Sequence, residues 1–291
     1  MLETGLVSTA WLSDRLGSPP LRILDASWYL PTSGRDARAE YLGGHVPGAM
    51  FFDLDAISDR STSLPHMLPS PAQFAEQVGA LGIADRNDVV VYDGSGTNLS
   101  AARVWWMFRM FGHEQVAVLD GGLPKWRAEG RRLEQGEVAV PAAVFTARSI
   151  PAGAVHDLGS VQGALERGEA QVVDMRSAGR FAGLEPEPRP GLRGGHIPGS
   201  RNLPFTELVG ADGTVLPQSA LRRRIAAAGV DPARPVIATC GSGVSACALL
   251  HALHLLGHRE GSLYDGAWAE WGAREDTPVE RGPGGPLSLS P

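Results

Sequence analysis

The chain has 291 residues, of which 43% are hydrophobic and 20% charged, with a formal net charge of −6. This length suggests two domains of about 150 residues, the apolar content excludes wholesale disorder, and the scattered basic residues provide no surface for nucleic acid or an anionic membrane. No apolar stretch reaches the ~20 residues of a transmembrane helix, and the N-terminus lacks the pattern of a secretory signal, so we expect a cytoplasmic protein.

Four segments of the first half recur in the second half, each at an offset of about 150 residues. In chain order the pairs are ILDASWYL with VVDMRSAGRF, GGHVPGA with GGHIPGS, VVVYDGSG with PVIATCGSG, and LDGGLPKW with YDGAWAEW. Each half therefore runs strand, loop, His-x-Pro-Gly turn, helix, strand, Gly-rich turn, helix, strand. This order predicts an α/β fold with two tandem domains, each a mainly parallel sheet with helices on both faces.

We place the first domain at residues 1–140 and the second at residues 156–277. Residues 141–155 between them are rich in Pro, Gly and Ala without helical periodicity, which is typical of a linker. Residues 278–291 are expected to form a poorly ordered or surface-lying tail. His45 and His196 occupy equivalent turns in both halves, so we interpret them as residues that fix a turn by side-chain hydrogen bonds.

Cys240 follows a continuous apolar run and precedes a Gly-rich turn and a helix. This order predicts a thiol at the carboxyl end of a strand, the edge where open α/β sheets bind ligands. Backbone N–H groups at a helix N-terminus stabilise an anionic sulfur, which favours a nucleophile, although a buried structural cysteine is the alternative. The second cysteine, Cys247, lies on the following helix and is expected to be a small buried side chain. Two cysteines are too few for a structural zinc site, and we predict no metal.

A Cys-x5-Arg phosphatase loop is disfavoured, because the sixth residue after Cys240 is Ala246. The sequence instead resembles the tandem-domain rhodanese family, and CGSGVS is similar to the loop of its 3-mercaptopyruvate sulfurtransferase branch. The resemblance covers nearly the whole chain and implies a persulfide on Cys240. The thiosulfate branch has two basic residues after the cysteine, whereas Gly241 and Ser242 stand here. Asp93 occupies the cysteine position in the first half, which implies a catalytically silent domain.

The resemblance also implies roles for individual residues. Arg180 and Arg189 match the two arginines that bind the substrate carboxylate and carbonyl, and their alternative is a pair of solvated loop arginines. The loop residues Gly241, Gly243 and Val244 are expected to contact substrate as well. Ser242, His66 and Asp55 match a Ser–His–Asp relay that moves the proton, although His66 is equally compatible with an ordinary loop histidine.

The expected activity is transfer of sulfur from 3-mercaptopyruvate, through Cys240, to a thiol, thioredoxin or cyanide, with release of pyruvate and without a cofactor. One alternative is a thiosulfate:cyanide sulfurtransferase. Another is a non-catalytic sulfur-relay protein, against which the intact pair Arg180 and Arg189 argues.

Overall fold

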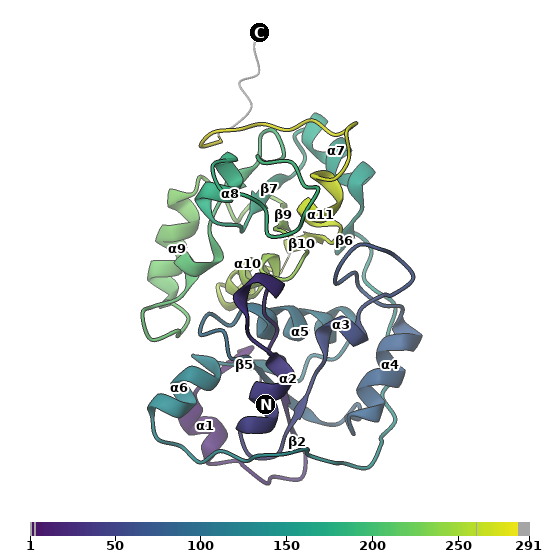
Figure 1. Ribbon diagram of the computed structural model, residues 1–291, viewed down its shortest axis with the longest axis vertical. Helices are drawn as coiled ribbons and strands as arrows, with labels where there is room; N and C mark the ends of the chain where they lie inside the picture. The colour runs from purple at the N-terminus through teal and green to yellow at the C-terminus, as the bar shows by residue number, and fades with distance from the viewer. Residues whose placement is uncertain (1, 3, 260, 285–291) are drawn as a thin grey trace. The chain divides into compact units, whose positions relative to one another are not determined.

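The computed structural model describes residue 2, residues 4–259 and residues 261–284 (Figure 1). The described residues form two compact units. The first unit lies within Met1–Ser61, Leu68–Pro151 and Val209–Val215, and the second within Thr62–Met67, Ala152–Leu208 and Leu216–Pro291. No helix among the described residues is long and apolar enough to cross a membrane.

The first unit is built on a parallel five-stranded sheet of order β1-β5-β4-β2-β3. Its strands are β1 (Leu6–Val7), β2 (Leu21–Asp25), β3 (Ala49–Phe51), β4 (Asp88–Tyr92) and β5 (Val116–Leu119). Its helices are α1 (Thr9–Ser13), a 3-10 turn (Pro31–Ser33), α2 (Ala37–Gly43), α3 (Leu54–Ile57), α4 (Pro71–Ala80), α5 (Leu99–Met110) and α6 (Gly122–Ala128).

The second unit repeats this plan, with a parallel sheet of order β6-β10-β9-β7-β8. Its strands are β6 (Val155–His156), β7 (Gln171–Asp174), β8 (Arg201–Asn202), β9 (Val236–Thr239) and β10 (Gly261–Tyr264). Its helices are α7 (Leu158–Glu166), α8 (Ala178–Ala182), a 3-10 turn (Phe205–Leu208), α9 (Gln218–Ala227), α10 (Ala246–Leu255) and α11 (Ala267–Trp271).

The strands β5, β7 and β9 are buried along their whole length, because helices flank both sheets. The apolar runs that predicted buried strands therefore form them, and the predicted fold class is confirmed. The aromatic run on α5 is a buried helix, with Trp105 and Trp106 each 2% exposed.

The two His-x-Pro-Gly turns are held in the same way. The Nδ1 atoms of His45 and His196 each contact a backbone carbonyl, at 2.9 Å from Tyr41 O and 2.8 Å from Phe181 O. Each imidazole also stacks on the ring of that same residue. A carbonyl only accepts hydrogen bonds, so Nδ1 carries the proton in both histidines. The predicted turn-fixing role is confirmed.

The compact units do not coincide with the halves of the sequence. Thr62–Met67 comes from the first half and belongs to the second unit, whereas Val209–Val215 comes from the second half and belongs to the first unit. The segment Val209–Val215 is held there by Asn98, whose Nδ2 donates to Gly213 O at 3.3 Å, and by Asp120, which accepts from Val215 N at 2.7 Å.

Residues 141–151 of the expected linker pack on the first unit, because Phe145 is 6% exposed and lies against Phe74 and Phe108. Of the expected tail, residues 278–284 are described. Glu280 exchanges backbone hydrogen bonds with His196 there, at 3.0 and 2.8 Å. Residues 285–291 lie outside the described residues.

The order of the second sheet creates a switch point between β7 and β9. From β7 the chain continues outward to β8, and from β9 it continues to β10 on the opposite side. The loops that leave β7 and β9 therefore diverge at the carboxyl edge of the sheet, where α/β proteins place ligands. The loop after β9 begins at Cys240, and the loop after β7 carries Arg176 and leads into α8, which carries Arg180.

Candidate active site

Cys240 is the residue that directly follows β9, and it is 2% exposed. Helix α11 holds its loop from behind, because Trp268 N donates to Cys240 O and Ala269 N donates to Gly241 O, both at 2.9 Å. Gly243 has φ +76°, a left-handed conformation that glycine adopts without strain. The loop then enters α10, so the thiol stands between the end of a strand and the start of a helix.

The loop presents unused backbone donors. Within the described part of the chain, the N–H groups of Gly241, Ser242 and Val244 donate no hydrogen bond. Successive N–H groups in such a turn form a concave site for an anion. Gly241 and Val244, together with Gly243, are the residues that we predicted to contact substrate.

The equivalent loop of the first unit is already filled by its own side chains. The carboxylate of Asp93 accepts from Ser95 N at 2.8 Å and from Ala101 N at 2.9 Å, and Gly94 N donates to Ser27 Oγ at 2.8 Å. Asp93 is completely buried. The Asp93 carboxylate thus stands where Cys240 stands in the second unit, and the catalytic silence of the first domain stays a prediction.

Arg180, on α8, lies beside the cysteine loop. Its Nη2 atom is 2.9 Å from the place where a Cβ on Gly241 would stand. Its guanidinium is also bound to Glu187, through Nη2 at 2.5 Å and Nε at 3.2 Å. The structure therefore brings together two of the predicted site residues, Arg180 and Gly241. Arg189 lies half-buried in the loop that follows α8, and its contact with substrate stays a prediction.

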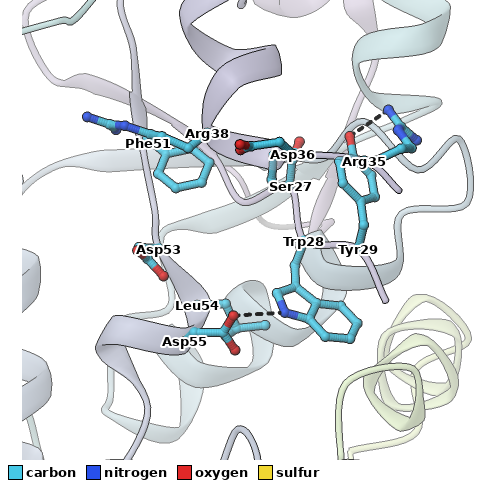
Figure 2. A pocket seen from close by; sticks show the side chains of 11 residues that line it. Ser27, Trp28, Tyr29, Arg35, Asp36, Arg38, Phe51, Asp53, Leu54 and Asp55 are labelled. Atoms are coloured by element: carbon cyan, nitrogen blue, oxygen red, sulfur yellow. Dashed lines mark hydrogen bonds between the residues drawn. The ribbon is translucent and has the colours of Figure 1, made fainter. Parts of the chain in front are cut away.

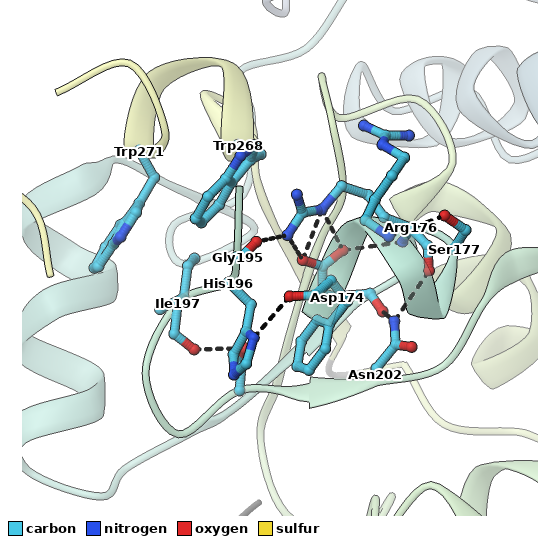
Figure 3. A network of polar contacts seen from close by, with 12 residues as sticks. Asp174, Arg176, Ser177, Gly195, His196, Ile197, Asn202, Trp268 and Trp271 are labelled. Atoms are coloured by element: carbon cyan, nitrogen blue, oxygen red, sulfur yellow. Dashed lines mark hydrogen bonds and ion pairs between the residues drawn. The ribbon is translucent and has the colours of Figure 1, made fainter. Parts of the chain in front are cut away.

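The sequence analysis missed Arg176 and Glu187, two further charged residues of the second unit. Arg176 is completely buried and donates through Nη2 to Asp174 Oδ2 at 2.6 Å and to Gly195 O at 2.8 Å (Figure 3). Its Nη1 donates to Glu187 Oε1 at 2.6 Å. Burial by itself lowers the pKa of Arg176, but Asp174 and Glu187 outweigh it and the net shift is upward. The sequence offered one signal for this network, an arginine two residues after a buried strand-end aspartate.

His66 and Ser242 are in direct contact. Nδ1 of His66 is 3.0 Å from Ser242 Oγ, and His66 is 4% exposed with φ +59°. Both residues belong to the second unit, because the segment Thr62–Met67 packs there. Two members of the predicted relay are thus brought together, and the Ser242 hydroxyl has an imidazole partner.

Asp55, the third member of the predicted relay, belongs to the first unit, and its contact with His66 stays a prediction. One of its carboxylate oxygens accepts a hydrogen bond from Trp28 Nε1 at 3.1 Å. Both side chains line a pocket of about 340 Å³, and Figure 2 shows the indole nitrogen directed at the carboxylate. Tyr29 and Arg35 line the same pocket, with the guanidinium 3.7 Å above the phenol ring.

Cys247 lies inside α10, completely buried, and its Sγ donates to Gly243 O at 3.4 Å. The thiol thus sits against the backbone of the helix, as expected of a small buried side chain. Across the described residues, no group of three or more His, Cys, Asp or Glu side chains is arranged to hold a metal ion.

Comparisons with known proteins match this geometry. The model of the rhodanese-like domain matches residues 8–129 and again residues 157–274. The chain is 46% identical to thiosulfate/3-mercaptopyruvate sulfurtransferase 1, mitochondrial, of Arabidopsis thaliana, covering 94% of this chain and 78% of that protein. It is 44% identical to human 3-mercaptopyruvate sulfurtransferase, covering 96% of each. The crystal structure of a 3-mercaptopyruvate sulfotransferase from Escherichia coli is similar, with TM-score 0.83 and 41% identity, covering 91% of this chain and 98% of that one.

Proposed function

The chain belongs to the rhodanese family, with two rhodanese-like domains in tandem, and we propose on this basis that it transfers sulfur from 3-mercaptopyruvate through a persulfide on Cys240. The observation that supports the proposal most strongly is the contrast between the two loops. The loop of Cys240 leaves backbone donors open, whereas in the loop of the first unit Gly94 N donates to Ser27 Oγ and Ser95 N donates to the Asp93 carboxylate. Only the former has room to stabilise an added anionic sulfur.

In the first half-reaction the Cys240 thiolate attacks the sulfur of 3-mercaptopyruvate. The new S–S bond forms as the C–S bond breaks, its electron pair goes to the methylene carbon, and the proton of the donor thiol ends on that carbon. The products are pyruvate and the Cys240 persulfide anion. In the second half-reaction an acceptor takes the outer sulfur: cyanide leaves as thiocyanate, and a thiol, free or in thioredoxin, leaves as its own persulfide. Cys240 is released as a thiolate, so no cofactor is needed.

We propose that the pair His66 and Ser242 transfers the proton of the donor thiol to the methylene carbon. Their 3.0 Å contact gives a route from the donor thiol to an imidazole and back to the enolate carbon. Asp55 is proposed to fix the tautomer of His66, as the family resemblance implies. Arg180 and Arg189 are proposed to bind the carboxylate and carbonyl of the keto acid, since guanidinium groups suit planar anions.

The choice of donor rests on Gly241. Any side chain at this position would have its Cβ 2.9 Å from Arg180 Nη2, so the flexible end of this arginine would have to shift. A basic residue there, as in the thiosulfate branch, would have to displace the arginine that is proposed to hold the keto acid. This geometry favours 3-mercaptopyruvate, a monoanion, over the dianion thiosulfate. A cytoplasmic location remains our expectation for the site of this reaction.

The experiment is a comparison of kcat/KM for 3-mercaptopyruvate and for thiosulfate on the purified protein, with cyanide as the common acceptor. We expect at least a tenfold preference for 3-mercaptopyruvate, which corresponds to about 1.4 kcal/mol of transition-state stabilisation. A preference for thiosulfate would keep the persulfide and reject our use of Gly241. If neither donor is turned over, the proposal that the protein is a sulfurtransferase is rejected and a sulfur-relay protein is favoured.

A further inference from the structure

A buried row of alternating charges connects β7 to the cysteine loop. It begins with Asp174 at the end of the strand, continues through Arg176 and Glu187, and ends at Arg180. The first three side chains are at most 2% exposed, and Arg180 is 18% exposed. The row carries two positive and two negative charges, so it has no net charge.

Arg176 is bonded on every nitrogen of its guanidinium. Arg176 uses Nε and Nη2 on Asp174, Nη1 on Glu187 and Nη2 again on Gly195 O, and its guanidinium lies 4.3 Å from the ring of Trp268. Figure 3 shows Arg176 between the Asp174 carboxylate and the Gly195 carbonyl. Buried ion pairs stabilise a protein poorly because desolvation opposes them, and their best-attested benefit is a unique geometry. The row is therefore suited to fix the position of its last member.

Glu187 divides its two carboxylate oxygens between the arginines. Oε1 accepts from Arg176 Nη1 at 2.6 Å, and Oε2 accepts from Arg180 Nη2 at 2.5 Å and from Nε at 3.2 Å. Within the described residues, Nη1 of Arg180 donates no hydrogen bond. Glu187 thus holds the Nε–Nη2 edge of this guanidinium, whose Nη2 is also the atom beside Gly241, and Nη1 is left for a ligand.

We propose that Glu187, itself fixed by Arg176, is a positioning residue that holds Arg180 against Gly241 with its Nη1 edge turned to the donor carboxylate. The inference rests on the proposed function, since it assigns Arg180 to the donor. It also opposes a second account of the same contacts, in which Glu187 competes with the donor for Arg180. A positioning carboxylate improves donor binding, whereas a competing carboxylate weakens it, so the two accounts predict opposite signs.

The test is the substitution Glu187→Gln, with Glu185→Gln as the matched control. Glu185 lies in the same loop, is exposed, and accepts from the Ser177 hydroxyl rather than from an arginine. We expect KM for 3-mercaptopyruvate to rise about tenfold in Glu187→Gln, the effect of one misplaced charge-assisted contact. Release of sulfur from the preformed persulfide to cyanide should be unchanged, and Glu185→Gln should match the wild type in both half-reactions.

A double-mutant cycle separates positioning from general stability. If Glu187 acts through Arg180, adding Glu187→Gln to Arg180→Ala should raise KM no further. Additive effects, or a lower KM in Glu187→Gln, would overturn the proposal.

Glu187→Asp is the second variant if the glutamine protein does not fold. It keeps the charge but cannot span both arginines, so a raised KM is expected and a wild-type KM would overturn the proposal. A wild-type protein inactive with both donors would instead reject the proposed function.

Discussion

At the scale of single residues, the two cysteines are both buried and differ in what surrounds the thiol. Cys240 directly follows β9, in a loop with open N–H donors, and Cys247 lies within α10 with its Sγ against the Gly243 carbonyl. We expect Cys240→Ser to abolish sulfur transfer, because a hydroxyl forms no persulfide, and Cys247→Ser to keep most of it. Turnover with 3-mercaptopyruvate and intact mass after donor treatment measure both effects. Equal loss in the two variants, or two added sulfur atoms per wild-type chain, would contradict a single nucleophile.

The residues that the sequence identified are those whose chemistry shows in local order. Cys240 follows an apolar run and precedes glycines, and the comparison with Asp93 in the other half marks it as special. The sequence analysis did not identify Arg176 and Glu187, because a charged residue in a loop ordinarily faces water. Glu187 stands among prolines and a further glutamate, and only tertiary structure buries it between two arginines.

At the scale of elements, Glu129 at the end of α6 ties that helix to α1. Its carboxylate accepts from the Thr9 hydroxyl at 2.6 Å and pairs with Arg131 and Lys125 at 2.5 and 3.0 Å. The Thr9 bond and then the Arg131 bond lower the pKa of Glu129 from 4.5 to about 2. A lowered carboxylate pKa means that this stabilisation is complete above pH ~4.5 and is lost as the pH falls toward about 2.

We therefore expect Glu129→Gln to lower the thermal unfolding midpoint at pH 7 by about 1–4 °C, since the group is 30% exposed and solvent screens the pairs to about 1 kcal/mol or less. The difference from wild type should shrink as the pH is lowered from 4.5 toward 3. Glu76→Gln, on the exposed face of α4, is the matched control and should leave the midpoint unchanged. A difference that persists undiminished at pH 3 would reject this account of Glu129.

The elements themselves were largely predictable. Buried parallel strands are recognised in the sequence as continuous apolar runs such as VVVY and VIAT. The internal repeat predicted the order of strands and helices along each half of the chain. The exchange of Thr62–Met67 and Val209–Val215 between units was not predictable. Neither segment has a helix or strand period, and what holds them is contact with residues far away in sequence, such as Asn98 and Ser242.

At the scale of the whole molecule, the two units share one plan but differ in the loop that follows the central strand. The first unit keeps the sheet and the turn histidine but fills its own loop with Asp93. Its sequence half also contributes Thr62–Met67, the segment that brings His66 to Ser242 in the second unit. The half that contains Cys240 therefore lacks by itself the imidazole that contacts Ser242, and both halves of the chain are needed for the proposed proton transfer.

This dependence predicts that His66→Asn slows pyruvate release by about 10²-fold, the usual contribution of one general acid–base group. Asparagine tolerates the left-handed φ of +59°, so the segment should keep its fold and the unfolding midpoint should stay near the wild type. Because His66 and Ser242 act as one unit, His66→Asn combined with Ser242→Ala should be no slower than the slower single variant. Single-turnover pyruvate release measures all three proteins. A wild-type rate in a folded His66→Asn variant would show that His66 is an ordinary loop histidine with no part in the proton transfer.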